Sequence, residues 1–451
     1  MLLNLMYGLV LIGLAPWMAI RAALTGRYRQ GLADWLLGTR QLPQPVNESS
    51  VAADSTSSNS PPDQDRPVVW FHGVSVGEVA LLGVVVAAFR KRHPDWRVII
   101  SCSTETGLTE ARKRFADLTV IRFPFDFTWA IRRVLTLVQP RLIVLAESEL
   151  WPNFLRQAQL RSVPVVVINA RMSPRSFKRF SMLRWILRPL LLSRITGFAA
   201  QSETYAEAYR KLGVPADRVT VTGSVKYDGA KGDRHAPEVQ QLRRAFAVQS
   251  NDLIWVAGST HAPEESLVLE SFRVLKERHR NLRLILVPRS VDRFNAVAEL
   301  IRSQGFTAIR RSQMTGPLTQ RAEVILIDTI GELGAVWGLA HLAFVGGTFD
   351  GRRGGQSMIE PAAYGMPIVL GPSFWNFRDA VIRLQEVGAA RVVPTPAGLT
   401  EAIRTLLDDP IGRERMSQAA RQLVRDQQGA TERTLRWLDR IVEQSKISKS
   451  D

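Results

Sequence analysis

Three short motifs place carboxylates or a lysine directly after apolar, strand-like runs of the sequence. Glu78 closes HGVSVGE, Glu147 and Glu149 lie in ESELWPN, and Lys226 lies in GSVKYD. Acidic side chains at the end of a buried strand are costly unless they are paired, hydrogen-bonded or used in chemistry. A carboxylate that reaches a substrate hydroxyl from such a position acts as a general base. These residues therefore form a candidate catalytic group.

Two of these side chains also have a simpler structural explanation. A carboxylate in the first turn of a helix is stabilised by the helix dipole, which would account for Glu78. Lys226 would be a solvated lysine in a connecting segment. The spacing of the motifs leaves both explanations open beside the functional one.

The second half of the chain contains a glycine-rich segment of a kind that binds anions. GGTF (346–349) and GGQS (354–357) bracket a Gly/Arg loop, and a helix beginning near Ser357 would direct backbone N–H groups at an anion. Glu360, just inside that helix, is placed to accept hydrogen bonds from both hydroxyls of a ribose. The loop is neither a Walker loop nor a G-x-G-x-x-G fingerprint. Without G-x-S-x-G or H-E-x-x-H, neither a hydrolase elbow nor a metal site is expected.

The elements that must position these residues alternate between short apolar runs and helical periodicity. Such alternation predicts α/β domains with parallel sheets covered on both faces. We expect two doubly wound, Rossmann-like domains at 67–230 and 238–430, facing a cleft, and then a C-terminal helix and tail at 431–451. The expected strands are Val68–Phe71, Val98–Ser101, Val120–Phe123, Leu142–Ala146, Val163–Ile168, Gly197–Gln201, Val219–Gly223, Leu253–Ala257, Leu282–Val287, Val324–Ile327, Leu342–Val345, Pro367–Leu370 and Ala390–Val393.

The N-terminal segment differs in composition from the rest of the chain. Residues 1–20 carry no charge, and Arg21, Arg27 and Arg29 follow them, so 1–25 is expected to be a membrane anchor with the bulk of the chain on the cytoplasmic side. Asn4 and Pro16 weaken a spanning helix, which leaves an in-plane anchor and a buried helix as alternatives. Residues 42–66 are rich in Ser, Pro and Asp and predict a flexible linker.

Composition and charge narrow the class of protein and of partner. Of the 451 residues 45% are hydrophobic and 22% charged, which excludes wholesale disorder and a polytopic membrane protein. One cysteine excludes a disulfide framework. The net charge of +17 indicates an anionic partner: nucleic acid, an acidic membrane face or a phosphorylated substrate. Residues 171–194 carry seven basic and no acidic side chains, either as a solvated face or as a surface for lipid phosphates.

Taken in order, HGVSVGE, ESELWPN, NARMS, GSVKYD, GSTH, VPR, DTIGEL, FVGGT and EPAAYGMP resemble one family. The chain is similar to the 3-deoxy-D-manno-octulosonic acid (Kdo) transferases of lipopolysaccharide assembly, from about Tyr28 to the C-terminal helices. It departs from that family at Ser148, where threonine is usual, and at Gln356 and Ser357, where GGHN is usual. The second departure affects side-chain contacts to the nucleotide rather than backbone ones.

The resemblance implies an inverting GT-B glycosyltransferase that moves Kdo from CMP-Kdo to a lipid A precursor, without a metal or other cofactor and without a nucleic-acid partner. It implies an inner-membrane location, catalytic domains on the cytoplasmic face, an acceptor-binding N-terminal domain and a CMP-Kdo-binding C-terminal domain. Glu78 matches the family's general base, and Glu147 and Lys226 match residues that stabilise the transition state. The positions that match the nucleotide site are Pro288, Arg289, Ile330, Gly331, Glu332, Ser357, Met358, Ile359 and Glu360.

The sequence alone leaves two other functions as alternatives. A GT-B transferase or epimerase that uses a UDP-sugar would be protected against heat by UDP rather than by CMP. A non-catalytic, membrane-tethered protein that binds anionic lipid or nucleic acid would carry spread basic residues without strand-end carboxylates. Glu78 and Glu147 disfavour the second rival.

Overall fold

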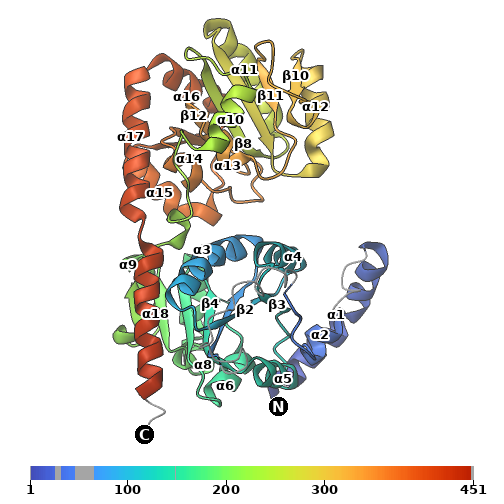
Figure 1. Cartoon of the computed structure of the whole chain (residues 1–451), viewed down its shortest axis with the longest axis vertical. Helices are drawn as coiled ribbons and strands as arrows, with labels where there is room; N and C mark the ends of the chain where they lie inside the picture. The colour runs from blue at the N-terminus through green and yellow to red at the C-terminus, as the bar shows by residue number, and fades with distance from the viewer. Residues whose placement is uncertain (1, 26–31, 46–65, 148, 448–451) are drawn as a thin grey trace, which may run out of the picture. The chain divides into compact units, whose positions relative to one another are not determined.

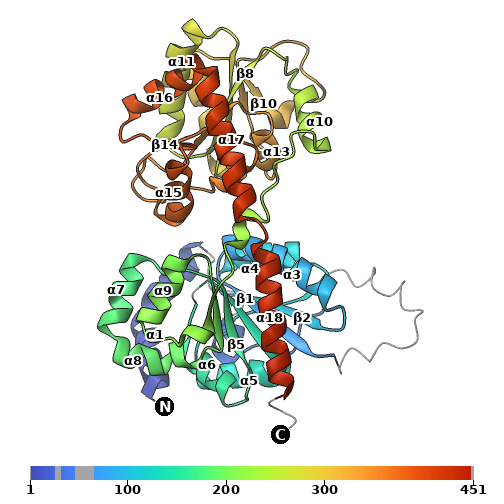
Figure 2. The same cartoon turned by 90° about the vertical axis from the view of Figure 1, so that its left-hand side faces the viewer.

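The chain forms two compact units, 1–229 with 428–451 and 230–427 (Figures 1 and 2). The computed structural model describes residues 2–25, 32–45, 66–147 and 149–447, so most of the expected linker at 42–66 lies outside the described residues. Each unit is built on one seven-stranded parallel sheet, which confirms the predicted α/β class with two doubly wound sheets. The cleft expected between the domains stays a prediction.

The sheet of the first unit has the strand order of a Rossmann-like domain. Its strands are β1 (Val68–Gly73), β2 (Arg97–Cys102), β3 (Thr119–Arg122), β4 (Pro140–Ala146), β5 (Val165–Ala170), β6 (Gly197–Ala200) and β7 (Val219–Val221). They lie in the order β3-β2-β1-β4-β5-β6-β7, and every pair is parallel. The order reverses between β1 and β4, which is where a doubly wound sheet opens a crevice for ligands.

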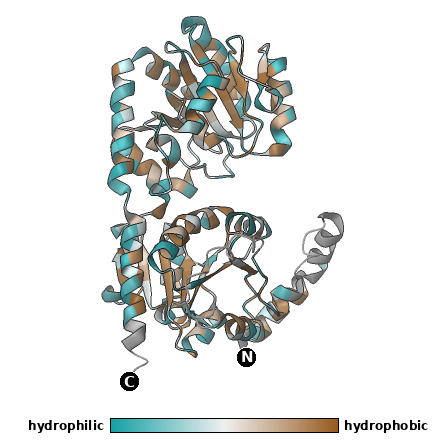
Figure 3. Cartoon of the chain, viewed as in Figure 1, coloured by the Kyte–Doolittle hydropathy of each residue, from teal (hydrophilic) through white to brown (hydrophobic). Residues whose placement is uncertain are grey.

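Helices cover both faces of this first sheet. The helices of this unit are α1 (Leu2–Thr25), α2 (Leu32–Leu37), α3 (Val76–Arg92), α4 (Glu105–Arg114), α5 (Thr128–Val138), α6 (Pro152–Gln159), α7 (Pro174–Met182), α8 (Arg184–Leu190), α9 (Glu203–Lys211) and α18 (Ala430–Ile447), with short 3₁₀ turns η2 (Leu192–Arg194), η3 (Ala216–Arg218) and η4 (Val225–Tyr227). Because successive side chains of a strand point to opposite faces, Trp70 packs with α5 and α6 while Phe71 packs with α3, α4 and α18. The strands are accordingly mostly hydrophobic (Figure 3).

The C-terminal helix differs from its expected place as a separate tail at 431–451. Residues 428–451 belong to the first unit, because α18 completes the cover of the first sheet. Trp437 and Leu438 of α18 are buried in the same cluster as Phe89 of α3. The apolar stripe of α18 therefore finds its partner far away in the sequence.

The second unit repeats the architecture. Its strands are β8 (Leu253–Thr260), β9 (Leu282–Pro288), β10 (Ala308–Arg310), β11 (Val324–Leu326), β12 (Leu342–Val345), β13 (Ile368–Leu370) and β14 (Ala390–Val392), in the order β10-β11-β9-β8-β12-β13-β14. All thirteen expected strands are present, and β10 is an additional one. Its three residues are only half-buried at the sheet edge, so they lack the apolar run that marks a covered strand.

The helices of the second unit form a core with the sheet. They are α10 (Pro237–Ala245), α11 (Glu264–Arg278), α12 (Phe294–Ser303), α13 (Leu333–Trp337), α14 (Ile359–Ala363), α15 (Arg378–Glu386), α16 (Pro396–Asp408) and α17 (Pro410–Gln427), with 3₁₀ turns η5 (Val291–Arg293), η6 (Arg311–Gln313) and η7 (Trp375–Phe377). One core cluster joins Trp255 of β8 to Phe272 of α11 and Ile403 of α16. The strand order reverses between β8 and β12.

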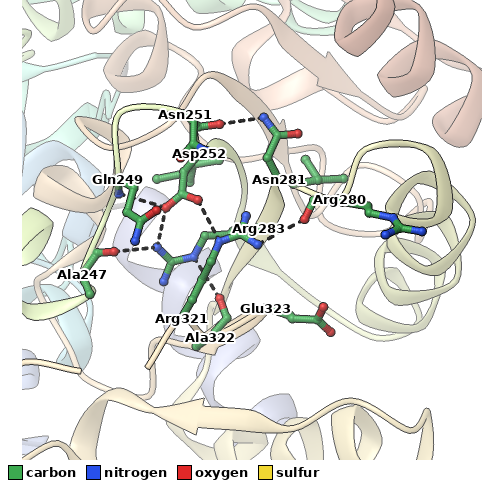
Figure 4. Close-up of polar contacts among 12 residues, drawn as sticks. Ala247, Gln249, Asn251, Asp252, Arg280, Asn281, Arg283, Arg321, Ala322 and Glu323 are labelled. Carbon is green, nitrogen blue, oxygen red and sulfur yellow. Dashed lines mark hydrogen bonds and ion pairs between the residues drawn. The ribbon is translucent and has the colours of Figure 1, made fainter. Parts of the chain in front are cut away.

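A buried ion pair links the amino ends of β8 and β9 (Figure 4). Arg283 donates to Asp252 at 2.8 Å, and their side chains are 1% and 0% exposed. Arg321 donates to the second oxygen of Asp252 at 2.9 Å. Burial raises the pKa of Asp252, but the Gln249 N–H and both guanidinium groups outweigh it, so the pKa lies below its ordinary value. This network stands at the edge of the sheet opposite the strand ends that carry the candidate site.

The predicted anchor at 1–25 forms the helix α1, with Pro16 inside it. Among the described residues, no helix is both long enough and apolar enough to cross a membrane. The anchoring role of this segment stays a prediction.

Candidate active site

Glu78 lies in the first turn of α3, directly after β1. Ser75 caps this helix, and its hydroxyl donates to Glu78 Oε1 at 3.2 Å, while the Val74 N–H donates to Glu78 Oε2 at 2.8 Å. The Ser75 hydroxyl also accepts the Glu78 N–H at 3.4 Å, so Glu78 has a structural function at the start of α3. Burial nevertheless raises the pKa of Glu78 to about 7, against the Val74 N–H and with a contribution from the charge of Glu147. A carboxyl poised near neutral pH also suits a general base.

Glu147 follows β4 and is held between two cations. Lys226 Nζ donates to Oε1 at 2.8 Å, and Arg171 Nε donates to Oε2 at 2.7 Å. Burial raises the pKa of Glu147, but Lys226 and Arg171 outweigh it and hold the pKa below its ordinary value. Its backbone has a φ of 60°, which is unusual for a residue with a side chain and is a form of strain found at functional sites. Glu147 therefore stays ionised in a fixed orientation.

The sheet order explains why these residues converge. β1 and β4 are neighbours, so Glu78 and Glu147 flank the point where the strand order reverses. Lys226 comes from η4, after the edge strand β7, and its long side chain reaches back to Glu147. The structure thus brings together the three predicted catalytic residues on one edge of the first sheet. Ser148, the next residue in the sequence after Glu147, lies outside the described residues.

Two residues of the NARMS segment were not expected at the catalytic group from the sequence. Arg171 supplies the second cation on Glu147. Asn169 is fully buried, has a φ of 52°, and accepts the Val225 N–H at 3.2 Å, which fixes the turn that carries Lys226. The sequence pattern that marked Glu147 also marks these two residues, because they lie at the end of the apolar run of β5 as the glutamates lie at the end of β4.

In the second unit, Arg289 and Glu360 are the predicted nucleotide residues with unengaged side chains. Arg289 follows Pro288 at the end of β9, and Glu360 lies in the first turn of α14; both are exposed. Within the described part of the chain, neither side chain has a hydrogen bond or ion pair. Partial burial of its carboxyl raises the pKa of Glu360, an effect that the nearby Arg289 offsets in part. A cation and a carboxylate are thus both presented to solvent at one sheet edge.

The segment after β11, which contains the predicted nucleotide residues Ile330, Gly331 and Glu332, offers a ligand an apolar side chain and backbone groups rather than a free charge. Ile330 is 78% exposed, and Gly331 has a φ of 91°. The carboxylate of Glu332 is already engaged, since Arg311 donates to it at 2.9 and 3.1 Å and the Thr329 hydroxyl also donates to it. A ligand here would meet the Ile330 side chain and the backbone rather than the Glu332 carboxylate.

The glycine-rich loop after β12 is tightly constrained. Gly354 and Gly355 have φ values of 73° and 82°, and a Cβ on Gly354 would lie 2.3 Å from the Trp375 ring. The helix expected near Ser357 begins at Ile359 and has five residues, and the side chains of Met358 and Ile359 are buried. Met358 and Ile359 therefore present only backbone groups to a ligand, whereas Ser357 is half-buried.

A fully buried carboxylate, not predicted from the sequence, holds this loop. Glu264 Oε1 accepts the N–H groups of Thr348 and Phe349 at 2.8 and 3.0 Å, and Oε2 accepts those of Gly347 and His261 at 2.8 and 3.0 Å. Burial raises the pKa of Glu264 despite these four donors. Glu264 and Glu265 follow the buried strand β8 in the sequence, as Glu147 and Glu149 follow β4, and this pattern could have identified Glu264.

Comparison with known proteins identifies the family. Residues 50–229 match the family described as 3-Deoxy-D-manno-octulosonic-acid transferase (kdotransferase). The 3-deoxy-D-manno-octulosonic acid transferase of Haemophilus influenzae is 34% identical over 86% of this chain and 90% of its own length. The chain belongs to this family. The transferase of Bordetella pertussis is 32% identical over 96% of this chain and 98% of its own. This Kdo transferase is therefore a glycosyltransferase of lipopolysaccharide biosynthesis.

Two solved structures are similar to parts or most of this chain. The UDP-GlcNAc 2-epimerase of Neisseria meningitidis, bound to UDP-GlcNAc, matches 79% of this chain and 98% of its own with a TM-score of 0.54 and 13% identity, a likeness of fold alone. The C-terminal CMP-Kdo binding domain of WaaA from Acinetobacter baumannii is 28% identical over 42% of this chain and 96% of its own, with a TM-score of 0.39.

Proposed function

We propose that this Kdo transferase moves Kdo from CMP-Kdo to a lipid A precursor of the lipid IVA type, with Glu78 as the general base. The observation that carries the proposal is the pair of carboxyls at the switch point of the first sheet. Burial raises the pKa of Glu78 to about 7, whereas Lys226 and Arg171 keep Glu147 ionised against its own burial. Two carboxyls whose pKa values are driven apart are typical of an acid–base site.

In the proposed reaction, Glu78 takes the proton of the acceptor hydroxyl as that oxygen attacks the ketosidic carbon of Kdo. The bond to the CMP phosphate breaks on the opposite side, so the configuration inverts and CMP leaves as an anion. CMP is already a good leaving group and needs no protonation. The Glu147–Lys226–Arg171 group supplies fixed charges beside the reacting centre, where pre-oriented electrostatics lower the barrier.

For the nucleotide, we propose that Arg289 meets the phosphate of CMP-Kdo and that Glu360 accepts the ribose hydroxyls. Both side chains are exposed, and the described residues offer them no partner. Ile330, 78% exposed, supplies an apolar contact to the base. The backbone around Ser357 contributes further contacts that do not depend on the GGQS side chains. A monophosphate lacks the diphosphate that most often recruits magnesium, so transfer is expected to persist in excess EDTA.

For the acceptor and location, we propose that the chain works at the cytoplasmic face of the inner membrane. The helices α7 and α8 pack Phe177, Phe180, Leu187 and Leu190 partly against the first core. On their other side, Met182, Leu183 and Trp185 are 70%, 46% and 77% exposed among basic residues. Each Lys or Arg near an anionic membrane contributes about 1 kcal/mol. The exposed apolar residues of α1 supply a second contact with the membrane.

The function is tested by transfer of labelled Kdo from CMP-Kdo to tetra-acylated lipid A precursor in detergent. Wild-type protein should form the product, and Glu78→Gln should lose on the order of 100-fold in kcat. Glu105→Gln is the control, because Glu105 is also a glutamate in the first turn of a helix, α4, that follows the neighbouring strand β2. No product with the wild type, or equal activity in the two variants, would contradict the proposal. Thermal protection by UDP but not by CMP would favour a UDP-sugar enzyme.

The membrane contact is tested separately with vesicles that contain anionic lipid. Replacing Arg175, Lys178 and Arg179 together by Gln should weaken salt-sensitive vesicle binding and raise the acceptor KM, leaving CMP affinity unchanged. The control removes the same charge from the second unit, at Arg302, Arg404 and Arg415. If both triple variants bind vesicles like the wild type, the α7–α8 face is only a solvated surface.

A further inference from the structure

The loop that carries Glu147 ends at a helix whose cap comes from elsewhere in the chain. Trp151, the residue before α6, gives that helix no side-chain cap. Asp126 does so instead: Oδ2 accepts the Asn153 N–H at 2.9 Å, and Oδ1 accepts the Phe154 N–H at 2.7 Å. A carboxylate at this position satisfies unpaired helical N–H groups and is favoured by the helix dipole. Asp126 and Asn153 are 5% and 4% exposed, so this junction is buried.

The first two turns of α1 dock on the same junction. The Tyr7 hydroxyl donates to Asp126 Oδ2 at 3.1 Å. Asn4 Oδ1 accepts from Asn153 Nδ2 at 3.0 Å and from the Thr128 N–H and hydroxyl at 3.2 and 3.1 Å. Asn4 and Tyr7 are three positions apart, so they share one face of the helix. The Asn4 that weakens a spanning helix therefore has a specific partner in the first unit.

Among the other described apolar side chains of residues 3–12, Leu3 and Leu11 are half-buried and the rest are exposed. Leu5, Met6, Leu9, Val10 and Ile12 are between 53% and 72% exposed. Apart from an edge-to-face contact of Tyr7 with Phe127, the contacts of Asn4 and Tyr7 with the first unit are polar and directed. Directed hydrogen bonds define one orientation of the helix, which apolar contact alone does not.

We propose that Asn4 and Tyr7 are positioning residues of the transfer reaction, which act through Asp126 and Asn153 on the loop from Glu147 to Trp151. This inference rests on the proposed function of Glu147. Only five residues separate Glu147 from Asn153, and Trp151 Nε1 donates to Glu149 Oε2 at 2.8 Å within that segment. A shift at the start of α6 is therefore passed to a loop whose first residue has a left-handed backbone. The N-terminal helix is thus part of the support of the site.

Asp126 is the acceptor shared by the Tyr7 hydroxyl of α1 and by the first N–H groups of α6. Burial raises its pKa to about 6, while the N–H groups of Asn153 and Phe154 and the Tyr7 hydroxyl lower it. An ionised, buried carboxylate depends on every donor that it has. Loss of the Tyr7 hydroxyl should therefore weaken the hydrogen bonds that the Asn153 and Phe154 N–H groups donate to Asp126.

The experiment uses the full chain in detergent, with Tyr7→Phe and Asn4→Ala as test variants and Thr109→Ala and Ile411→Ala, at exposed positions of α4 and α17, as controls. Hydrogen–deuterium exchange of the peptide that covers 147–155 should be about tenfold faster in the test variants and unchanged in the controls. The kcat for Kdo transfer should fall about tenfold in the test variants, with the CMP-Kdo KM within twofold of the wild type. A purely structural contribution would lower the unfolding midpoint without this separation of kcat from KM.

Combining Tyr7→Phe with Asp126→Asn should cost no more kcat than Asp126→Asn alone, because both act through one carboxylate. Unchanged exchange at 147–155 in both test variants would overturn the proposal, and so would faster exchange with an unchanged kcat. If wild-type protein transfers no Kdo, the proposed function fails. The exchange data then still decide whether α1 controls the order of this loop.

Discussion

The rate of Kdo transfer should depend on pH through the ionisation of Glu78. Burial is the largest cause that raises its pKa to about 7, and the charges of Glu147 and Glu149 act in the same direction. The Val74 N–H and the Ser75 hydroxyl lower it. A general base works in its deprotonated form, so activity should rise with pH through this pKa and level off above it.

The size of the effect follows from the pKa. With a midpoint near 7, about one molecule in eleven carries the base form at pH 6 and about ten in eleven at pH 8, so kcat/KM should increase about tenfold. An unperturbed glutamate, with a pKa of about 4.3, would give no change across this range. The assay is transfer of labelled Kdo at subsaturating acceptor, in buffers of constant ionic strength.

Two results would refute this account of Glu78. A flat kcat/KM between pH 6 and pH 8 would mean that no group with the predicted pKa acts as the base. The second test is Glu149→Gln, which removes one of the charges that raise the pKa of Glu78 and retains an oxygen acceptor for the Trp151 indole. This variant should lower the midpoint of the profile, so an upward shift would show that the electrostatic cause is wrong.

Three further predictions concern the second unit. Glu360→Ala should weaken CMP binding by roughly 1–3 kcal/mol, measured by calorimetry, because the ribose hydroxyls lose a charged acceptor; unchanged affinity would remove Glu360 from the site. Glu264→Gln should weaken CMP binding and lower the unfolding midpoint, since an amide replaces one acceptor oxygen with a donor that faces backbone N–H groups; a Kd and midpoint equal to those of the wild type would contradict this. Asp252→Asn should cost roughly 3–5 kcal/mol in urea unfolding, because Arg283 is left buried without its counter-ion. Since the folded-state pKa of Asp252 is depressed, its contribution should be complete above about pH 4 and lost as the pH falls through that depressed value.

The positions of the strands and the approximate position of the site could be predicted from the sequence, because both depend on short stretches of neighbouring residues. A strand buried on both faces reads as a continuous apolar run, as in Val68–Phe71, and such runs need no knowledge of their neighbours. Polar residues directly after such runs marked Glu78, Glu147 and Lys226, because strand ends are where a doubly wound sheet presents its ligands. The same rule, applied to Glu264 and Arg171, would have found both.

The partners of those residues were decided only by the tertiary structure. Glu147 meets Lys226 and Arg171 because the sheet order places the ends of different strands on one edge, and no periodicity in the sequence encodes that order. The raised pKa of Glu78 likewise depends on burial and on charges brought close by folding. The docking of Asn4 and Tyr7 on Asp126, and of α18 on the first sheet, joins segments more than a hundred residues apart. A hydrophobic pattern predicts which face of a helix or strand is buried. It does not predict which other element packs against that face, because this depends on the packing of the whole unit.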